Sequence, residues 1–176
     1  MQYGFYFDEG RCIACSACVF ACKDWNEEQP ETGVYWRRVT TEESGKCPNV
    51  RLSSMSLSCL HCEKPACQPV CQGGAISKRA EDGIVVVDRA KCLGCRSCAK
   101  ACPFGAPQFG ADGTMQMCNF CLAKVQQGGQ PECAMACTGR ALFAGPMPEL
   151  ARLAATRGGV RMAGDTLPSM WVLKAR

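Results

Sequence analysis

CIACSACVFAC (residues 12–22) and CLGCRSCAKAC (residues 92–102) share the spacing C-x2-C-x2-C-x3-C and match at every cysteine. Two further groups keep the opening C-x2-C pair and the closing x3 step, but their middle interval is four residues in group two and eleven in group four. The groups together hold sixteen of the 17 cysteines, and Cys47 stands alone. In chain order they are Cys12, Cys15, Cys18, Cys22; Cys59, Cys62, Cys67, Cys71; Cys92, Cys95, Cys98, Cys102; and Cys118, Cys121, Cys133, Cys137.

The shared spacing is the one with which bacterial ferredoxins bind 4Fe-4S clusters, and Pro103 after Cys102 completes that run. Three thiolates of the compact loop bind three irons of one cube, while the fourth cysteine, on the following turn, serves a neighbouring cube. Two such groups therefore form a two-cluster unit. Sixteen ligands match four 4Fe-4S clusters with none missing, and the matching groups indicate an internal duplication.

Zinc and disulfides are the alternatives for so many cysteines. Zinc is typically bound by two C-x2-C pairs a dozen or more residues apart, which group four alone could satisfy and the compact groups do not. Disulfide geometry is rarely met by cysteines three residues apart in a tight loop, and 17 is an odd number. The spacing therefore favours iron–sulfur clusters.

Composition and charge agree with an interior that is partly inorganic. The hydrophobic fraction is 47% with cysteine counted and falls to roughly 38% without it, which is low for a chain of 176 residues. Metal binding would supply the missing folding free energy. The formal charge of +4 would become about −4, since each oxidised cube with four thiolates carries about −2.

The pattern between the cysteine groups predicts an α+β fold with short strands and short helices. We expect strands at residues 4–7, 34–40, 52–57 and 141–143, and a hairpin of residues 75–78 and 84–87 around Asp82-Gly83. Residues 23–50, which include Glu27-Glu28 and Cys47, are interpreted as an insertion. Residues 151–176 form a C-terminal tail whose apolar end, 167–173, packs either on its own body or on a partner.

No catalytic site is predicted. The sequence contains neither a G-x-G-x-x-G nor a Walker motif, and its single histidine, His61, is interpreted as packing or donating to a cluster sulfur. Arg96 lies inside a ligand loop, where its charge would raise a cluster potential. Cys47 is expected to be a free thiol. We also expect no membrane span and no export signal at residues 1–8.

Several segments carry a more specific resemblance: Cys59-Leu-His-Cys62-Glu-Lys-Pro-Ala-Cys67, residues 82–88, and Cys95 to Gln108. Over roughly residues 3–150 the chain resembles the four-cluster electron-transfer subunit of DMSO-reductase-type molybdenum and tungsten enzymes. The resemblance implies a non-catalytic beta subunit. It would relay electrons between a molybdopterin or tungstopterin catalytic subunit and a membrane anchor or other redox partner. It does not choose the substrate.

The resemblance also implies how the ligands pair. Groups one and four form unit A and groups two and three form unit B, both within an interleaved core of residues 1–150, so that two ferredoxin-like units are fused. The implied ligand sets are Cys12, Cys15, Cys18, Cys137 (cluster 1); Cys118, Cys121, Cys133, Cys22 (cluster 2); Cys59, Cys62, Cys67, Cys102 (cluster 3); and Cys92, Cys95, Cys98, Cys71 (cluster 4). Lys23, Gln72 and Thr138 depart from the family in replacing the proline after a group.

Other functions remain open on the residues alone. A free soluble polyferredoxin carrier would use the same clusters, and a cluster-based redox sensor would need a nucleic-acid-binding element that the sequence does not display. Hence no nucleic-acid partner is expected. The expected location is cytoplasmic or peripheral to a membrane, or periplasmic if a twin-arginine-tagged partner carries the folded chain across.

Overall fold

A computed structural model describes residues 1–26 and 33–175, so the predicted acidic pair Glu27-Glu28 lies outside the described residues. The strands are β1 (Tyr3–Asp8), β2 (Arg38–Lys46), β3 (Asn49–Leu57), β4 (Ile76–Lys78), β5 (Val85–Val87), β6 (Gln108–Phe109), β7 (Met115–Gln116), β8 (Leu142–Pro146), β9 (Val160–Arg161) and β10 (Met170–Leu173). The helices are α1 (Ala17–Trp25), α2 (Ser97–Ala101), α3 (Leu122–Val125), α4 (Glu132–Met135) and α5 (Met147–Arg157), with short 3-10 turns η1 (Glu9–Arg11) and η2 (Arg89–Lys91).

Small sheets and short helices agree with the predicted α+β class and with a ferredoxin-like fold. The strand predicted at 4–7 is β1, and the predicted hairpin is β4–β5, with Ile76 opposite Val87. The prediction at 34–40 was only partly right, because the strand begins at Arg38. Val34 and Trp36 instead bury their side chains in the core, where Trp36 Nε1 donates to Gln116 Oε1 at 3.1 Å.

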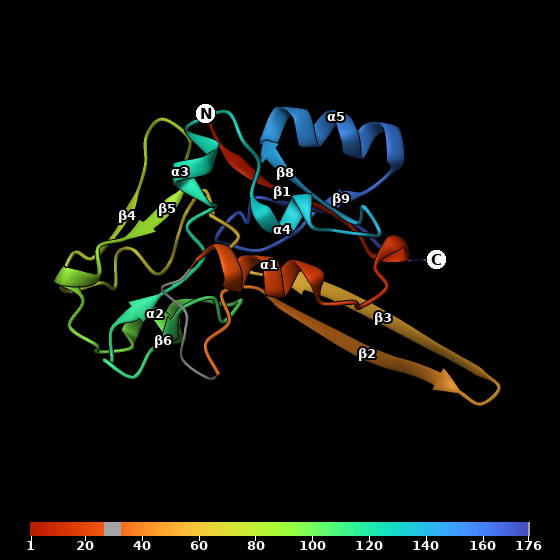
Figure 1. Cartoon of the computed structure of the whole chain (residues 1–176), viewed down its shortest axis with the longest axis horizontal. Coiled ribbons are helices and arrows are strands. Elements are labelled where there is room, and N and C mark those ends of the chain that lie inside the picture. Colours follow the sequence, from red (N-terminus) through yellow and green to blue (C-terminus); the bar gives the residue numbers. More distant parts are fainter. Residues whose placement is uncertain (27–32, 176) are drawn as a thin grey trace.

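A four-stranded sheet in the order β8-β1-β10-β9 separates two layers (Figure 1). Its central strand β1 alternates its side chains: Tyr6 packs against α5 on one face, whereas Phe5 and Phe7 enter the cysteine-rich core on the other. The helix α5 supplies Leu150 and Ala154, one turn apart, to its side of the sheet. The sheet therefore forms one wall of the region that holds the cysteines.

The apolar end of the chain docks on its own body, one of the two alternatives that the sequence left open. Strand β10 runs parallel to β1, with Phe5 opposite Met170. The loop before it holds the group-two loop, since Lys64 N donates to Thr166 O at 3.0 Å and Ser169 N donates to Leu60 O at 3.1 Å. The tail is thus a structural support of the second cysteine group.

The strands β2 and β3, of nine residues each, form an antiparallel hairpin that projects from the body (Figure 1). Its base is packed, with Ser54 and Ser56 buried, whereas residues 40–52 are exposed. Cys47 lies exposed between the two strands. No helix within residues 1–26 and 33–175 combines the length and apolar character needed to cross a bilayer.

Gly4 allows β10 to approach β1, and its replacement by alanine should destabilise the sheet. A Cβ at Gly4 would lie 2.2 Å from Ser169 O and 2.6 Å from Met147 Sδ. We expect Gly4→Ala to lower the free energy of unfolding by about 1–3 kcal/mol, as overpacking does. Its partner across the ladder, Gly145, is a matched control, because a Cβ there meets nothing closer than Glu149 Oε2 at 3.9 Å.

Denaturant unfolding of the cluster-loaded protein measures both variants. Gly145→Ala should stay within about 0.5 kcal/mol of the parent. Equal effects of the two substitutions would contradict the close approach at Gly4.

Candidate iron–sulfur centres

All four cysteine groups begin with the same backbone turn. The residue two positions after the first cysteine is left-handed in each group, with φ of 53° at Ala14, 43° at His61, 65° at Gly94 and 60° at Phe120. This conformation is uncommon for residues other than glycine and marks a constrained site. The shared turn was not predicted from sequence, because only Gly94 signals it by residue type.

In groups one and three the turn is followed by a short helix that carries or adjoins the later cysteines. In group one, Cys18 and Cys22 lie on α1, and in group three Cys98 lies on α2 while Cys102 follows it directly. Ser16 and Arg96, which precede the two helices, have nearly identical left-handed φ values of 59° and 60°. The internal repeat seen in the sequence is therefore also a repeat of local structure.

Two cavities are lined by thiols from two different groups. The first is lined by three cysteines of group one and one of group four: Cys12, Cys15, Cys18 and Cys137. The second is lined by three cysteines of group two and one of group three: Cys59, Cys62, Cys67 and Cys102. In both, apolar side chains complete the wall, such as Leu142 in the first and Leu60 in the second.

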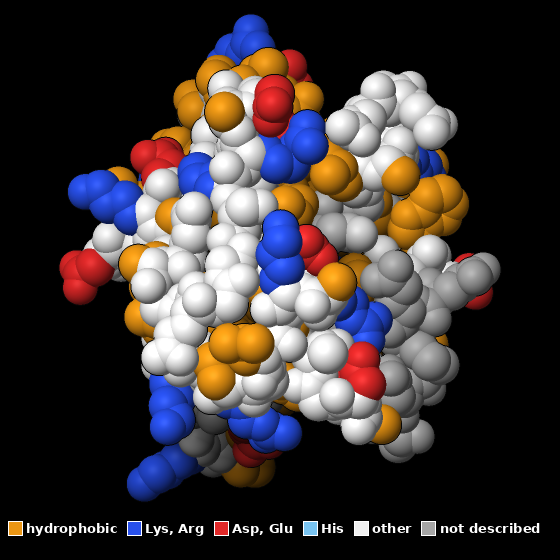
Figure 2. Space-filling model, turned by 90° about the vertical axis from the view of Figure 1, so that its left-hand side faces the viewer, with side chains coloured by type: hydrophobic (Ala, Val, Ile, Leu, Met, Phe, Trp, Pro, Cys, Tyr) orange, Lys and Arg blue, Asp and Glu red, His pale blue; other side chains and the backbone are white. Residues whose placement is uncertain are grey.

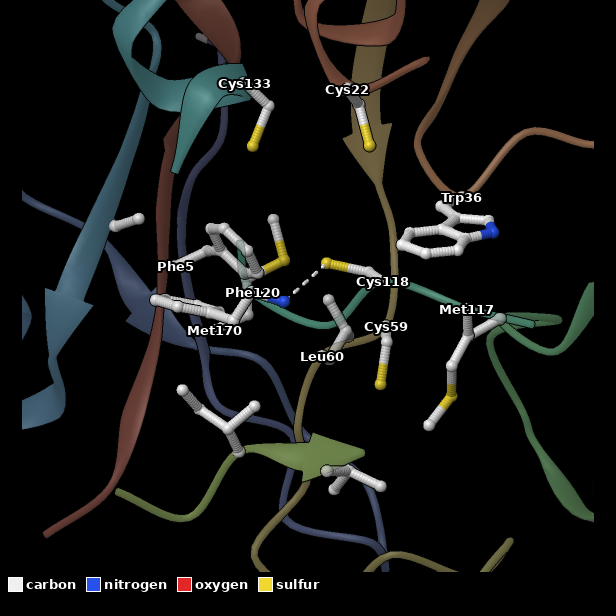
Figure 3. Packing of buried hydrophobic residues seen from close by; sticks show 14 of the residues in the cluster. Phe5, Cys22, Trp36, Cys59, Leu60, Met117, Cys118, Phe120, Cys133 and Met170 are labelled. Atoms are coloured by element: carbon white, nitrogen blue, oxygen red, sulfur yellow. Dashed lines mark hydrogen bonds between the residues drawn. The ribbon is translucent and has the colours of Figure 1, made fainter. Parts of the chain in front are cut away.

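The remaining cysteines also approach one another across groups. Burial, and then the neighbouring thiols of Cys118, Cys133 and Cys121, raise the pKa of Cys22. Figure 3 shows the sulfurs of Cys22, Cys118 and Cys133 directed into a common space. Burial, and then the neighbouring thiols of Cys92 and Cys71, raise the pKa of Cys98, and Cys95 is exposed at the surface.

The chemistry of this donor set fits iron–sulfur clusters. Burial raises the pKa of both Cys67 and Cys133 to about 12, so these thiols are neutral without metal and release protons when they become ligands. In the described part of the chain no three Cys, His, Asp or Glu side chains are close enough to hold a single metal ion. A 4Fe-4S cube binds its thiolates at separate corners rather than at one ion.

Donors from the surrounding chain point at the sulfurs. Backbone N–H groups donate to the Sγ atoms of Cys71, Cys92 and Cys137 at 3.3, 3.3 and 3.2 Å. Phe120 N–H donates to Cys118 Sγ at 3.4 Å (Figure 3). Such bonds stabilise negative charge on sulfur and so help to set a cluster's reduction potential.

The structure places both His61 and Arg96, which the sequence analysis singled out. His61 is fully buried, and burial lowers its pKa to about 3, so its ring is neutral. Its Nδ1 accepts from Val85 N at 3.0 Å and its ring packs against Phe120, which agrees with a packing role. Arg96 is exposed and lies over the ring of Phe109, so solvent screens its charge from the interior.

Arg37 is the residue that sequence reasoning missed. Its side chain is 2% exposed and lies among the cysteines of groups one and four. A polar residue before a strand gives no sequence signal of burial, because this depends on how β2 and β3 dock on the core.

Comparison with known proteins places these features in a family. Residues 50–147 match the model of the 4Fe-4S dicluster domain. The sequence is 45% identical over 158 residues to a chain of the anaerobic dimethyl sulfoxide reductase of Escherichia coli K12, covering 85% of this protein and 76% of that one. It is 35% identical to a subunit of the sulfite dehydrogenase of Allochromatium vinosum, covering 92% and 77%.

A third relative is the formate dehydrogenase iron-sulfur subunit of Wolinella succinogenes. It is 36% identical over 191 residues, which cover 95% of this protein and 93% of that one. The relatives are thus chains or subunits of enzymes that are named for different substrates. With four groups of four cysteines for four 4Fe-4S clusters, the protein belongs to the family of ferredoxin-like electron-transfer subunits of DMSO-reductase-type molybdenum and tungsten oxidoreductases.

Proposed function

We propose that this chain is the non-catalytic beta subunit of a complex and relays electrons between a molybdopterin or tungstopterin catalytic subunit and a membrane anchor or other redox partner. The observation that carries the proposal is the pair of cavities, each lined by four thiols drawn from two cysteine groups. The bound clusters supply one-electron redox chemistry. The chain itself excludes water, holds the thiolates and directs N–H groups at them.

The proposed ligand sets are those implied by the family. They are Cys12, Cys15, Cys18, Cys137 for cluster 1; Cys118, Cys121, Cys133, Cys22 for cluster 2; Cys59, Cys62, Cys67, Cys102 for cluster 3; and Cys92, Cys95, Cys98, Cys71 for cluster 4. The two cavities support the first and third sets. The neighbours of Cys22 and of Cys98 support the second and fourth.

The same contacts support two fused units within residues 1–150, with groups one and four in unit A and groups two and three in unit B. The units meet at Cys59, a cluster 3 ligand, whose pKa is raised by burial and then by the neighbouring thiol of Cys118, a cluster 2 ligand. Figure 3 shows these two side chains in one close-up of the core. Electrons therefore have a buried crossing point between the units.

Exposed ligands mark where electrons would enter and leave. Cys15 in unit A and Cys95 in unit B are both exposed, and each is flanked in its own loop by an exposed apolar side chain, Ile13 or Leu93. On the face seen in Figure 2, lysine and arginine side chains are dispersed among hydrophobic and polar ones. Apolar contact beside an exposed ligand suits docking of a redox partner better than a broad basic surface would.

A free polyferredoxin carrier is the second candidate, and one observation favours it. The apolar tail, which would have argued for a partner, packs on the chain's own sheet. The family resemblance outweighs this, because the relatives are named as chains or subunits of larger enzymes. We propose a location in the cytoplasm or peripheral to a membrane, with co-export beside a twin-arginine-tagged partner as the alternative.

Native purification separates the two candidates. Anaerobic size exclusion of the tagged chain from its own cells should give a complex much larger than 19.0 kDa that contains molybdenum or tungsten. Ile13, exposed in the loop beside Cys15, tests this docking surface: Ile13→Glu should reduce recovery of the partner, whereas Val160→Glu on β9 should not. A stable monomer without molybdenum or tungsten would refute the proposed subunit function and support a free electron carrier.

A further inference from the structure

Arg37 is a buried cation held in place by two serines. Its Nη1 donates to Ser56 Oγ at 3.1 Å and its Nη2 to Ser58 Oγ at 2.8 Å. The guanidinium also lies over the ring of Phe5, 4.6 Å from its centroid. Ser56 lies in β3 at the base of the hairpin and Ser58 directly follows that strand, and both side chains are buried. The side chain is therefore fixed.

The positive charge of Arg37 lacks a carboxylate partner. Within residues 1–26 and 33–175, Arg37 forms no ion pair with Asp or Glu, and its buried Nε has no hydrogen-bond partner. An unpaired charge in a protein interior is strongly unfavourable, so a cation kept here needs an anion. The structure therefore points to an anion other than an Asp or Glu carboxylate of the described residues.

Cysteine ligands of two clusters are the nearest source of that negative charge. Burial by itself would lower the pKa of Arg37, but Cys133, Cys118, Cys22 and Cys18 together raise it. Cys18 belongs to the set for cluster 1, and the other three belong to the set for cluster 2. Ser56 links Arg37 to Cys18, because its hydroxyl oxygen accepts from Arg37 Nη1 and lies 3.4 Å from Cys18 Sγ.

We propose that Arg37 is the shared buried counter-cation of clusters 1 and 2, and that it raises the reduction potentials of both. A one-electron reduction adds a negative charge to a cluster, and a fixed guanidinium in a low-dielectric interior stabilises that charge. Arg37 stays protonated throughout, so no proton needs to accompany the electron. The proposal rests on the ligand sets given under the proposed function.

Unit B contains a different cation, Lys78. It is half-buried, and its ammonium is already satisfied by Gln2 Oε1, Cys62 O and Gly83 O at 2.7, 2.9 and 2.8 Å. Lys78 lies beside Cys62 of cluster 3. Loss of Arg37 should therefore change the potentials of clusters 3 and 4 much less than those of clusters 1 and 2, which makes them internal references.

The test is an EPR-monitored redox titration of the cluster-loaded complex with Arg37→Gln. We expect the one-electron equilibria of clusters 1 and 2 to shift about tenfold toward the oxidised form, a fall of about 59 mV in each potential. The exposed Arg152 on α5 is a matched control, and Arg152→Gln makes the same charge change without effect. No shift, or an equal shift of all four potentials, would overturn the proposal.

If Arg37→Gln fails to assemble clusters, Arg37→Met decides. Methionine removes the positive charge and fills the apolar interior without an unpaired polar group, so we again expect the larger fall at clusters 1 and 2. Unchanged potentials in that variant would then count against Arg37. The wild-type complex separates this result from failure of the proposed function, which would appear as missing clusters or wrongly paired signals before any arginine is changed.

Discussion

Replacement of Cys22 by serine is expected to change the cluster bound by group four and to spare the cluster bound by the rest of group one. Cys22 lies on the same helix as Cys18, yet its neighbours are Cys118, Cys133 and Cys121. The first cavity is instead completed by Cys137. Loss of a thiolate ligand should convert or remove cluster 2, and so interrupt electron transfer between clusters 1 and 3.

EPR of the reduced complex measures which signal changes, and electron transfer between the two redox partners should fall at least about a hundredfold, as losses of metal-site residues commonly cause. Cys47→Ser is the matched control, because Cys47 is exposed in the hairpin and should leave iron content and all signals unaltered. A change in the cluster 1 signal alone, with cluster 2 intact, would show that the groups pair differently.

Removal of the clusters is expected to unfold most of the chain. The main hydrophobic core includes eight buried cysteines, Cys18, Cys22, Cys59, Cys62, Cys67, Cys98, Cys118 and Cys133. Without metal their thiols would surround empty space, as in the two cavities. Burial free energy lost to cavities and metal-binding free energy lost with the clusters act in the same direction.

Near-UV circular dichroism before and after oxidative removal of iron measures this effect. We expect the tertiary signal to disappear and to return on reconstitution with iron and sulfide. The Gly145→Ala protein, which keeps a normal sheet, should behave like the parent. An apoprotein that retains cooperative unfolding at the parent's denaturant midpoint would contradict a cluster-dependent core.

Local features of the fold could be predicted from sequence. Strand β1 and the hairpin β4–β5 follow short apolar runs with a clear turn signal at Asp82-Gly83, and the cysteine spacing identifies every group. Both kinds of signal lie within short stretches of at most 20 neighbouring residues, the length of the group from Cys118 to Cys137. The cysteine groups needed no tertiary information to be recognised.

Non-local features could not be predicted in the same way. The parallel pairing of β10 with β1 joins residues more than 160 positions apart, and no local pattern specifies it. The burial of Arg37 depends on Ser56 and Ser58 from another strand and on cysteines from three further segments. Likewise, which group completes which cavity follows from packing of whole units, so the sequence supported it only through family resemblance.

Quantification of iron and acid-labile sulfide in the anaerobically purified complex tests the central claim most directly. Four complete 4Fe-4S clusters require about sixteen irons and sixteen sulfides per chain. We predict both values, with no stoichiometric zinc in the subunit, and the same values in the Cys47→Ser variant. Far fewer irons, or zinc in their place, would contradict the assignment of the four cysteine groups to four clusters.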